Sequence, residues 1–387
     1  MAHSVRDAVI VEAVRTPFGK RNGSFKDTHP EVLASLPLKA VTERLGLKAS
    51  EIDDVIYGNV TPVGEQGLNI ARKAALLAWN EDCVAGVQLN RMCGSAQQAI
   101  NFAAQGIMSG VNDIVIAGGV EHMTRVPIGS DAGPLSEALT ERYEILHQGE
   151  SAERVADKWG LSRLELDQFA LASQQKYAAA RDAGHYKSQI VPAHVKVDGV
   201  EKVIENDEHP RASTIEGIQK LKTVFRDGTD DRPARITAGN SSGIVDGASA
   251  LVVTSPETAR AHGWTPRARI VAQASVGSDP VLMLTGPIPA TKKALSKAKL
   301  TVDDIDLFEC NEAFASVPLA WARDCGVPLS KVNVNGGAIA HGHPLGASGA
   351  ALVTKLVHEL ERSGKRYGLS TMCIGFGQGI ATIVERL

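Results

Sequence analysis

The length, composition and charge of the chain are those of an ordinary globular protein with two or three domains. It has 387 residues, 43% hydrophobic and 22% charged, which is too long for one hydrophobic core. Lys and Arg total 41 against 44 Asp and Glu, a net charge of −3, and this balance argues against a protein whose overall field gathers nucleic acid or anionic membrane.

The cysteines and the chain ends indicate the compartment. The odd number of cysteines, their wide spacing and the lack of a C-x-x-C pair argue against a disulfide framework or a structural zinc site. The first residues contain no apolar signal-peptide core, and no apolar run reaches about 18 residues. The last residues, IVERL, are not a peroxisomal address. We therefore expect a soluble cytoplasmic protein without membrane insertion, in which a single thiol can act as a nucleophile.

The predicted elements occur twice in the same order. The first copy is a strand, a helix and three strands, predicted at 8–11, 39–47, 51–56, 87–90 and 113–119. The second copy is predicted at 268–271, 293–300, 304–308, 332–335 and 368–373. The paired segments lie roughly 250 residues apart and keep their order, which is typical of a duplicated β/α unit.

The region between the copies has a different pattern. It is richer in charge, and helices are predicted at 151–159 and 165–182 before a strand at 249–253 returns to the first sheet. Strands alternating with helices indicate an α/β fold in which helices cover the sheets. The resulting division is an N-terminal half (1–119 plus 246–266), an inserted loop domain (120–245) and a C-terminal half (267–387).

Cys93 lies where a predicted strand ends and a helix of small residues begins, in the segment LNRMCGSAQQAI (89–100). Free N–H groups and the positive end of the helix dipole are expected to stabilise a thiolate there. Gly94 and Ser95 leave the approach to the sulfur open. A buried structural cysteine at a tight turn explains this segment equally well.

His343 lies in the corresponding segment of the second copy, NGGAIAHGHPLGASG (335–349). The five glycines of this segment do not suit the interior of a regular helix, and they indicate a backbone that approaches a neighbouring group closely. A pseudo-twofold arrangement brings this junction toward the one that carries Cys93, as a catalytic Cys–His pair requires. The spacing of His341 and His343 also suggests a metal, but no third cluster of ligands accompanies them. A structural histidine pair is the remaining alternative.

Two further segments carry groups suited to catalysis. Cys373 ends a predicted strand and is followed by alternating glycines, whose N–H groups can form an oxyanion hole while the thiol moves a proton. Asn311 and Glu312 follow the strand at 307–309, where they can orient a water or a carbonyl oxygen. The alternatives are a glycine turn with an incidental cysteine and a helix N-cap. Cys83, Cys310 and Cys325 have no predicted role.

These four segments, together with RTPFG at 15–19, resemble the thiolase family in content and in order over nearly the whole chain. The resemblance implies two pseudo-symmetric α/β/α/β/α-layered halves with a loop domain inserted in the first. It implies an acyltransferase (an acetyl-CoA C-acyltransferase) of fatty-acid β-oxidation that forms homodimers or homotetramers. Acyl-CoA and coenzyme A are then substrates, and no cofactor or metal is expected.

The resemblance also implies a role for each residue of the reacting site. Cys93 resembles the nucleophile that takes the acyl group as a thioester, and His343 resembles the base that activates it. Cys373 resembles the second acid and base. In the family, one oxyanion hole is formed by His343 and a water held by Asn311, and the other by the N–H groups of Cys93 and Gly375.

Residues that match the family's substrate contacts lie mostly in the inserted region. The resemblance assigns CoA or acyl contacts to Arg211, Ala238, Ser242, His147 and Gln148. Many thiolases have a methionine at the position of Gln148, so the acyl preference is expected to differ here. Phe376 and Gln378 replace a more usual glycine and an apolar residue, which is expected to change the pocket beside Gly375.

The leading hypothesis is thiolytic cleavage of a 3-ketoacyl-CoA by free CoA through a Cys93 acyl-enzyme. One alternative is a short-chain acetoacetyl-CoA thiolase that works in condensation. Another is a non-catalytic thiolase-like protein that binds acyl-CoA or lipid. The presence of Cys93 and Cys373 argues against it, because binding alone requires no pair of thiols. A 3-ketoacyl synthase is disfavoured because that relative usually has a second histidine at the position of Asn311.

Overall fold

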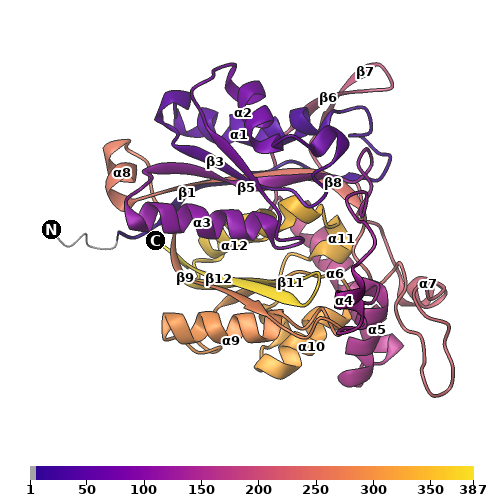
Figure 1. Cartoon of the computed structure of the whole chain (residues 1–387). Helices are drawn as coiled ribbons and strands as arrows, with labels where there is room; N and C mark the ends of the chain where they lie inside the picture. Colours follow the sequence, from indigo (N-terminus) through magenta and orange to yellow (C-terminus); the bar gives the residue numbers. More distant parts are fainter. Residues whose placement is uncertain (1–5) are drawn as a thin grey trace.

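The structure is a computed structural model that describes residues 6–387; the first five residues of the predicted N-terminal half lie outside the described residues. Figure 1 shows alternating layers of helices and strands. Helices α1 (Pro30–Leu45) and α2 (Ile70–Trp79) cover one outer face, and α9 (Pro287–Ala298) and α10 (Ser316–Cys325) the other. Between the two groups of strands lie α3 (Ser95–Ser109) and α12 (Leu345–Ser363). The predicted α/β/α/β/α layering is confirmed.

The strands of both halves follow one order. In the first half it is β1 (Val9–Arg15), β8 (Val245–Thr254), β5 (Ile114–His122), β3 (Asp54–Gly58) and β4 (Gly86–Leu89). In the second half it is β9 (Ala268–Gly277), β12 (Gln378–Arg386), β11 (Tyr367–Ile374) and β10 (Leu307–Cys310). The halves join where β1 pairs with β9 through two residues of each strand, and β2 (Gly19–Lys20) pairs with β8. The predicted repeat is confirmed.

One predicted strand, 332–335, does not form. Its counterpart β4 is a true strand, but here only Val332 makes an isolated bridge to Phe308. Asn333 has a φ of 45°, which leaves the extended conformation. Its side chain instead accepts a hydrogen bond from the Cys310 N–H and donates one to the Cys310 carbonyl, both at 2.9 Å. The hydrogen bonds of the Asn333 side chain therefore take the place of those that the backbone of a paired strand would make to Cys310.

The central helix α12 is buried from Leu345 to Leu360 because it lies between two sheets. Its first turns consist of small residues, and this allows backbones to approach closely. A Cβ on Gly119 of β5 would lie 2.0 Å from the carbonyl oxygen of Gly346. Only glycine fits this crossing, which fixes the start of α12 beside the ends of β3 and β5.

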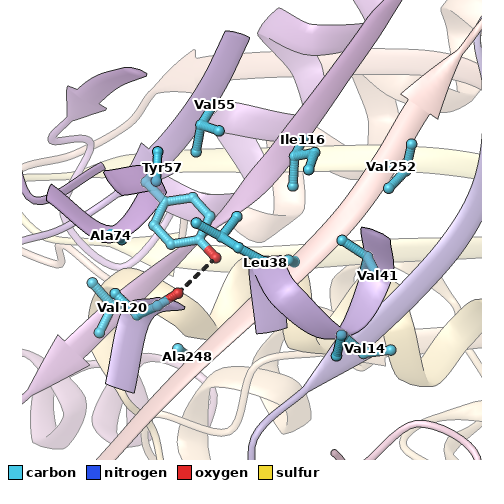
Figure 2. Close-up of a cluster of buried hydrophobic side chains, with 14 of the residues drawn as sticks. Val14, Leu38, Val41, Val55, Tyr57, Ala74, Ile116, Val120, Ala248 and Val252 are labelled. Carbon is cyan, nitrogen blue, oxygen red and sulfur yellow. Dashed lines mark hydrogen bonds between the residues drawn. The ribbon is translucent and has the colours of Figure 1, made fainter. Parts of the chain in front are cut away.

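The core of the first half lies between its sheet and α1. Figure 2 shows Val55, Ile116 and Val252 of the strands facing Leu38 of α1. Tyr57 is fully buried in the same cluster, and its hydroxyl donates a hydrogen bond to the carbonyl of Ala34 at 3.3 Å. This partner allows a phenol to remain inside an apolar core.

A long insertion separates β5 from β8, whereas the equivalent connection between β11 and β12 is a three-residue turn at 375–377. The insertion contains α4 (Glu137–Thr140), α5 (Gln148–Lys158), α6 (Arg163–Asp182), β6 (Ala193–Val197), β7 (Val200–Ile204) and α7 (Ile215–Gln219). Helices α5 and α6 correspond to the two predicted there. The domain bounds given above stay a prediction.

A fully buried ion pair ties the insertion to β1. Arg15 contacts both carboxylate oxygens of Asp207, at 2.6 and 2.8 Å. Asp207 also accepts hydrogen bonds from the Phe18 N–H and the Tyr177 hydroxyl. This network pairs the two buried charges and holds the insertion against the first half.

The remaining elements are short. They are η1 (Ala49–Glu51), η2 (Gly64–Gln66), α8 (Pro256–Ala261), η3 (Leu329–Lys331) and α11 (Ala338–His341). Across residues 6–387, no helix combines the length and the apolar character needed to cross a membrane.

His358 of α12 makes the folded state sensitive to acid. Burial lowers its pKa to about 4, and its ring contacts the Ser188 hydroxyl and the Ala13 carbonyl, each at 2.9 Å. The unfolded value is near 6.5, so the unfolded chain binds the proton first and stability falls as pH drops from 6.5 toward 4. When the pH is lowered from 7.5 to 5, we expect the unfolding free energy of the parent to fall by about 2 kcal/mol more than that of the His358→Gln variant. Urea unfolding at both pH values measures this difference, and equal losses would contradict it.

Candidate active site

Cys93 lies in the turn between β4 and α3. Met92 before it has a φ of 45°, and the Ser95 hydroxyl fixes this conformation by accepting from the Arg91 N–H at 2.9 Å and donating to the Met92 carbonyl at 2.6 Å. A Cβ on Gly94 would lie 2.4 Å from Cδ1 of Ile374. The turn therefore presses against the end of β11, which brings Cys93 to the other half.

The Cys93 sulfur is protonated at neutral pH. Burial raises its pKa to about 11, although hydrogen bonds from its own N–H, from the Gly375 N–H and from the Gln148 side chain lower it. The nearby charge of Glu121 raises it further. The thiolate expected from the helix start is therefore wrong for the resting state, because desolvation outweighs the N–H donors. A base is needed for attack.

His343 is held as a neutral base. Ser348 donates its hydroxyl hydrogen to the Pro344 carbonyl at 2.8 Å, so its oxygen accepts from Nδ1–H of His343 at 2.5 Å. This leaves Nε2 unprotonated, and Nε2 accepts from Nδ2 of Asn311 at 3.2 Å. Burial lowers the pKa of His343 to about 4. The ring is therefore a neutral acceptor at pH 7.

Asn311 connects this histidine to the second thiol. Its N–H donates to the Thr371 carbonyl at 3.0 Å, so it lies beside β11 two residues from Cys373. Its side-chain oxygen is buried and has no hydrogen-bond partner among residues 6–387. A buried carbonyl oxygen of this kind requires a polar partner such as a water or a substrate group.

Cys373 is also buried and protonated. Burial raises its pKa well above the usual range, and a negative charge on Cys93 raises it further. The two sulfurs therefore lie close enough for their charges to interact. Gly375 follows at the end of β11, where a Cβ would lie 2.5 Å from Sδ of Met92. Five of the predicted residues (Cys93, His343, Cys373, Asn311 and Gly375) thus lie at the facing ends of the two halves.

A cavity of about 620 Å³ opens beside this group. Its lining includes Lys20, Arg21, His209, Val224, Phe225, Ala238, Ser241, Ser242, Gly243 and Ile244. The backbone carbonyl of Gly243 accepts a hydrogen bond from the backbone N–H of His343 at 3.0 Å. This bond links the cavity wall to the residue that carries the predicted base.

The predicted substrate contacts are arranged around this cavity. Ala238 and Ser242 line it, and the exposed side chain of Arg211 donates to the Ala238 carbonyl at 3.3 Å. His147 stacks on Phe225 with ring centres 5.1 Å apart. Gln148 follows His147, and its Nε2 lies 3.5 Å from the position that a Cβ of Gly375 would occupy.

Several residues of the site were missed from the sequence. Ser348, which fixes the His343 tautomer, stands five positions after it in the first turn of α12, a spacing that could have suggested the contact. Lys20 and Arg21 give the cavity two cationic side chains, and they follow the RTPFG segment directly. Glu312, in contrast, turns away to Ser173 and Asn333, so it supports the fold rather than the site.

The two departures from the family pattern have structural consequences. Phe376 has a φ of 60°, which favours glycine, and 40% of its surface is exposed. Gln378 donates to the Gly375 carbonyl at 3.4 Å and accepts from Arg91 at 3.3 Å. The side-chain amide of Gln378 therefore contacts the carbonyl of Gly375, the residue whose N–H is predicted to form part of an oxyanion hole.

His341, the other histidine of the glycine-rich segment, is buried and bonds the Gly342 carbonyl through Nδ1 at 2.9 Å. Burial holds its pKa well below the usual range. Within the part of the chain that the structure describes, no group of three or more His, Cys, Asp or Glu residues is arranged to hold a metal ion.

The fold and this site are those of an acyl-transferring α/β enzyme built from two related halves. The family model "Thiolase, N-terminal domain" matches residues 8–257, and "Thiolase, C-terminal domain" matches residues 264–386. The chain belongs to the thiolase family, and it is an acyltransferase of that family.

Individual relatives agree over almost the full length. A steroid 3-ketoacyl-CoA thiolase of Mycobacterium tuberculosis is 43% identical, with 98% of this chain and 94% of the relative covered. A beta-ketoadipyl-CoA thiolase of Pseudomonas aeruginosa is 43% identical over 99% of this chain and 100% of the relative. The crystal structure of the Bacillus anthracis acetyl-CoA acetyltransferase superposes with a TM-score of 0.92 at 38% identity and covers both chains completely.

Proposed function

We propose that Cys93 is the nucleophile, His343 its base and Cys373 the second acid and base of this acyltransferase. The reaction is thiolytic cleavage of a 3-ketoacyl-CoA by free CoA, which gives acetyl-CoA and a shortened acyl-CoA. One observation carries the assignment of roles: the turn that holds Cys93 packs against Ile374, the neighbour of Cys373 at the end of β11, and Asn311 joins Nε2 of His343 to the same strand. Claisen cleavage needs a nucleophile and a separate proton donor, whereas binding needs neither.

In the first half-reaction, Nε2 of His343 takes the thiol proton as the Cys93 sulfur attacks the 3-keto carbon. The N–H groups of Cys93 and Gly375 stabilise the resulting oxyanion. The bond between C2 and C3 then breaks, and its electron pair moves to C2 as an enolate. His343 and a water held by the buried oxygen of Asn311 stabilise the enolate oxygen. Cys373 gives its proton to C2, so acetyl-CoA leaves and Cys93 carries the acyl group.

In the second half-reaction, the Cys373 thiolate takes the proton of an incoming CoA thiol. The CoA sulfur attacks the thioester carbon, and the bond to Cys93 breaks. The Cys93 sulfur regains its proton from His343, which returns both groups to their resting states. Because burial lowers the pKa of His343, the imidazolium gives up this proton readily.

The substrate contacts belong to the same proposal. Ala238 and Ser242 line the cavity that would receive pantetheine, and Arg211 lies near its edge. Lys20 and Arg21 supply positive charge for the CoA phosphates. His147 stacks on Phe225 of the cavity wall, and Gln148 follows it in the chain. Fatty-acid β-oxidation, a cytoplasmic location and a homodimer or homotetramer complete the proposal.

A chain-length series tests the proposed function. Purified protein is mixed with free CoA and 3-ketoacyl-CoA substrates of increasing length, and the loss of the ketoacyl enolate absorbance is followed. We expect cleavage of several chain lengths. Activity with the four-carbon substrate alone would favour an acetoacetyl-CoA thiolase. No activity at any length would favour an acyl-CoA-binding protein instead.

A further inference from the structure

The side chain of Glu121 lies at the end of β5 and is fully buried. Its Oε1 accepts hydrogen bonds from the backbone N–H of Thr61 at 3.2 Å and from the side-chain amides of Asn59 and Gln66 at 3.3 and 2.9 Å. These residues belong to the segment that runs from β3 to the end of η2. Oε1 therefore anchors the carboxylate to the first half of the protein.

The other oxygen, Oε2, joins the two halves. It accepts from the N–H of Val60, which follows β3, at 2.8 Å, and from the N–H of Gly346, in the first turn of α12, at 2.9 Å. A Cβ on Gly346 would lie 2.7 Å from this oxygen, so a side chain there would push the helix away from the carboxylate. The positive end of the α12 dipole favours a negative charge at this point.

These hydrogen bonds are those of an ionised carboxylate. Each partner is an N–H donor, whereas a protonated carboxyl would need an acceptor for its own hydrogen. Burial raises the pKa of Glu121, but N–H bonds to a charged acceptor are stronger than bonds to a neutral one and offset this cost. A glutamine in its place would turn an NH₂ group toward one of the two sets of donors.

A chain of hydrogen bonds leads from Oε2 to the Cys93 turn. The Val60 carbonyl accepts from Nδ2 of Asn90 at 2.9 Å, and Oδ1 of Asn90 accepts from the Met92 N–H at 2.7 Å. Met92 is the residue with positive φ that directly precedes Cys93. Val60 also packs against the apolar cluster that contains Cys93. A shift of the carboxylate is therefore passed to the peptide that carries the nucleophile.

On the other side, Oε2 fixes the start of the helix that follows His343. Only Pro344 and Leu345 separate His343 from Gly346. The proline ring restricts φ at the first of them, and its carbonyl accepts from the Ser348 hydroxyl at 2.8 Å. Leu345 is buried in the cluster that contains the nucleophile. The segment between the Gly346 N–H and the imidazole is therefore short and constrained.

We propose that Glu121 is a positioning residue of this enzyme: one carboxylate oxygen binds both the segment that supports the Cys93 turn and the helix start that carries His343, and thereby fixes the nucleophile and its base relative to each other. The proposal rests on the proposed function and adds a residue to it. No proton moves to or from Glu121. Its effect is on the rate of attack, which falls steeply when the reacting groups are misplaced.

The rate of Cys93 acylation tests this role. Parent and Glu121→Gln are mixed rapidly with acetoacetyl-CoA, and intact-mass measurement follows the acyl group that the protein gains. The amplitude of the time course gives the folded fraction, whereas the rate constant reports the geometry of the folded molecules. We expect the rate constant of Glu121→Gln to fall about tenfold. In the steady state, kcat should fall with it while KM stays within about twofold, because the substrate cavity is unchanged.

Glu153→Gln is the matched control. Glu153 is a fully buried glutamate of α5 that accepts from the N–H groups of Arg235 and Ile236 at 2.9 and 2.8 Å, and these contacts lie within the insertion. We expect this variant to lower the midpoint of thermal unfolding, as Glu121→Gln does, but to keep the parent rate constant. Equal slowing of the two variants would overturn the proposal, since loss of any buried carboxylate would then explain the effect.

Asn90→Ala interrupts the chain of hydrogen bonds at an exposed residue, so it tests the proposal independently of the folding of Glu121→Gln. We expect its acylation rate constant to fall about fivefold. A parent-like rate constant in folded Glu121→Gln or in Asn90→Ala would overturn the role of Glu121. If the parent itself is not acylated by any 3-ketoacyl-CoA, the proposed function is wrong. If the parent is acylated and these variants match it, only the role of Glu121 is wrong.

Discussion

Replacing Cys93 with alanine is expected to abolish the acyl-enzyme and to lower thiolysis by about four to six orders of magnitude. The residual rate reflects binding and the oxyanion donors, which the variant keeps. Cys373 cannot replace the nucleophile, because burial and the geometry of β11 hold it as a protonated thiol on the other half. Intact-mass measurement after mixing with a 3-ketoacyl-CoA should show an added acyl group on the parent and none on the variant.

The Cys83→Ala variant is the matched control for this experiment. It makes the same substitution at an exposed thiol of the first half, ten positions before the buried Cys93. We expect it to form the acyl-enzyme and to turn over at the parent rate. Unimpaired thiolysis by the Cys93 variant would show that Cys93 is not the nucleophile.

The fold could be predicted because each strand and helix has a recognisable local sequence pattern and because these patterns occur twice along the chain. Each strand of the repeat is a short apolar run, and each central helix begins with the small residues that two stacked sheets require. The segment 332–335 is the exception, because the strand predicted there does not form. Its apolar alternation predicts a strand, but the positive φ of Asn333 and its bonds to Cys310 depend on a partner more than twenty residues away.

The positions of Cys93 and His343 could be predicted, but their protonation could not. A helix start is visible in the sequence, whereas the depth at which Cys93 is buried is set by residues of both halves. Desolvation therefore reverses the expected direction of the pKa shift. The His343 tautomer likewise depends on the hydrogen bond that the Ser348 hydroxyl makes with a backbone carbonyl.

Replacing Cys373 with alanine is expected to leave Cys93 acylation possible but to lower turnover by about two to four orders of magnitude, the usual contribution of general acid and base catalysis. The nucleophile, its base and the Gly375 N–H remain, so the acyl group can still be transferred while water slowly protonates C2. The second half-reaction then lacks its base. Intact-mass measurement should show an acyl-enzyme that accumulates over minutes and is not cleared by CoA.

Cys325→Ala is the control for this variant, since it removes a half-buried thiol of α10 that has no place in the mechanism. It is expected to turn over like the parent. Two outcomes would contradict the role of Cys373: turnover of the Cys373 variant at the parent rate, or an acyl-enzyme that CoA clears normally. The first would remove Cys373 from both half-reactions, whereas the second would leave it only the protonation of C2.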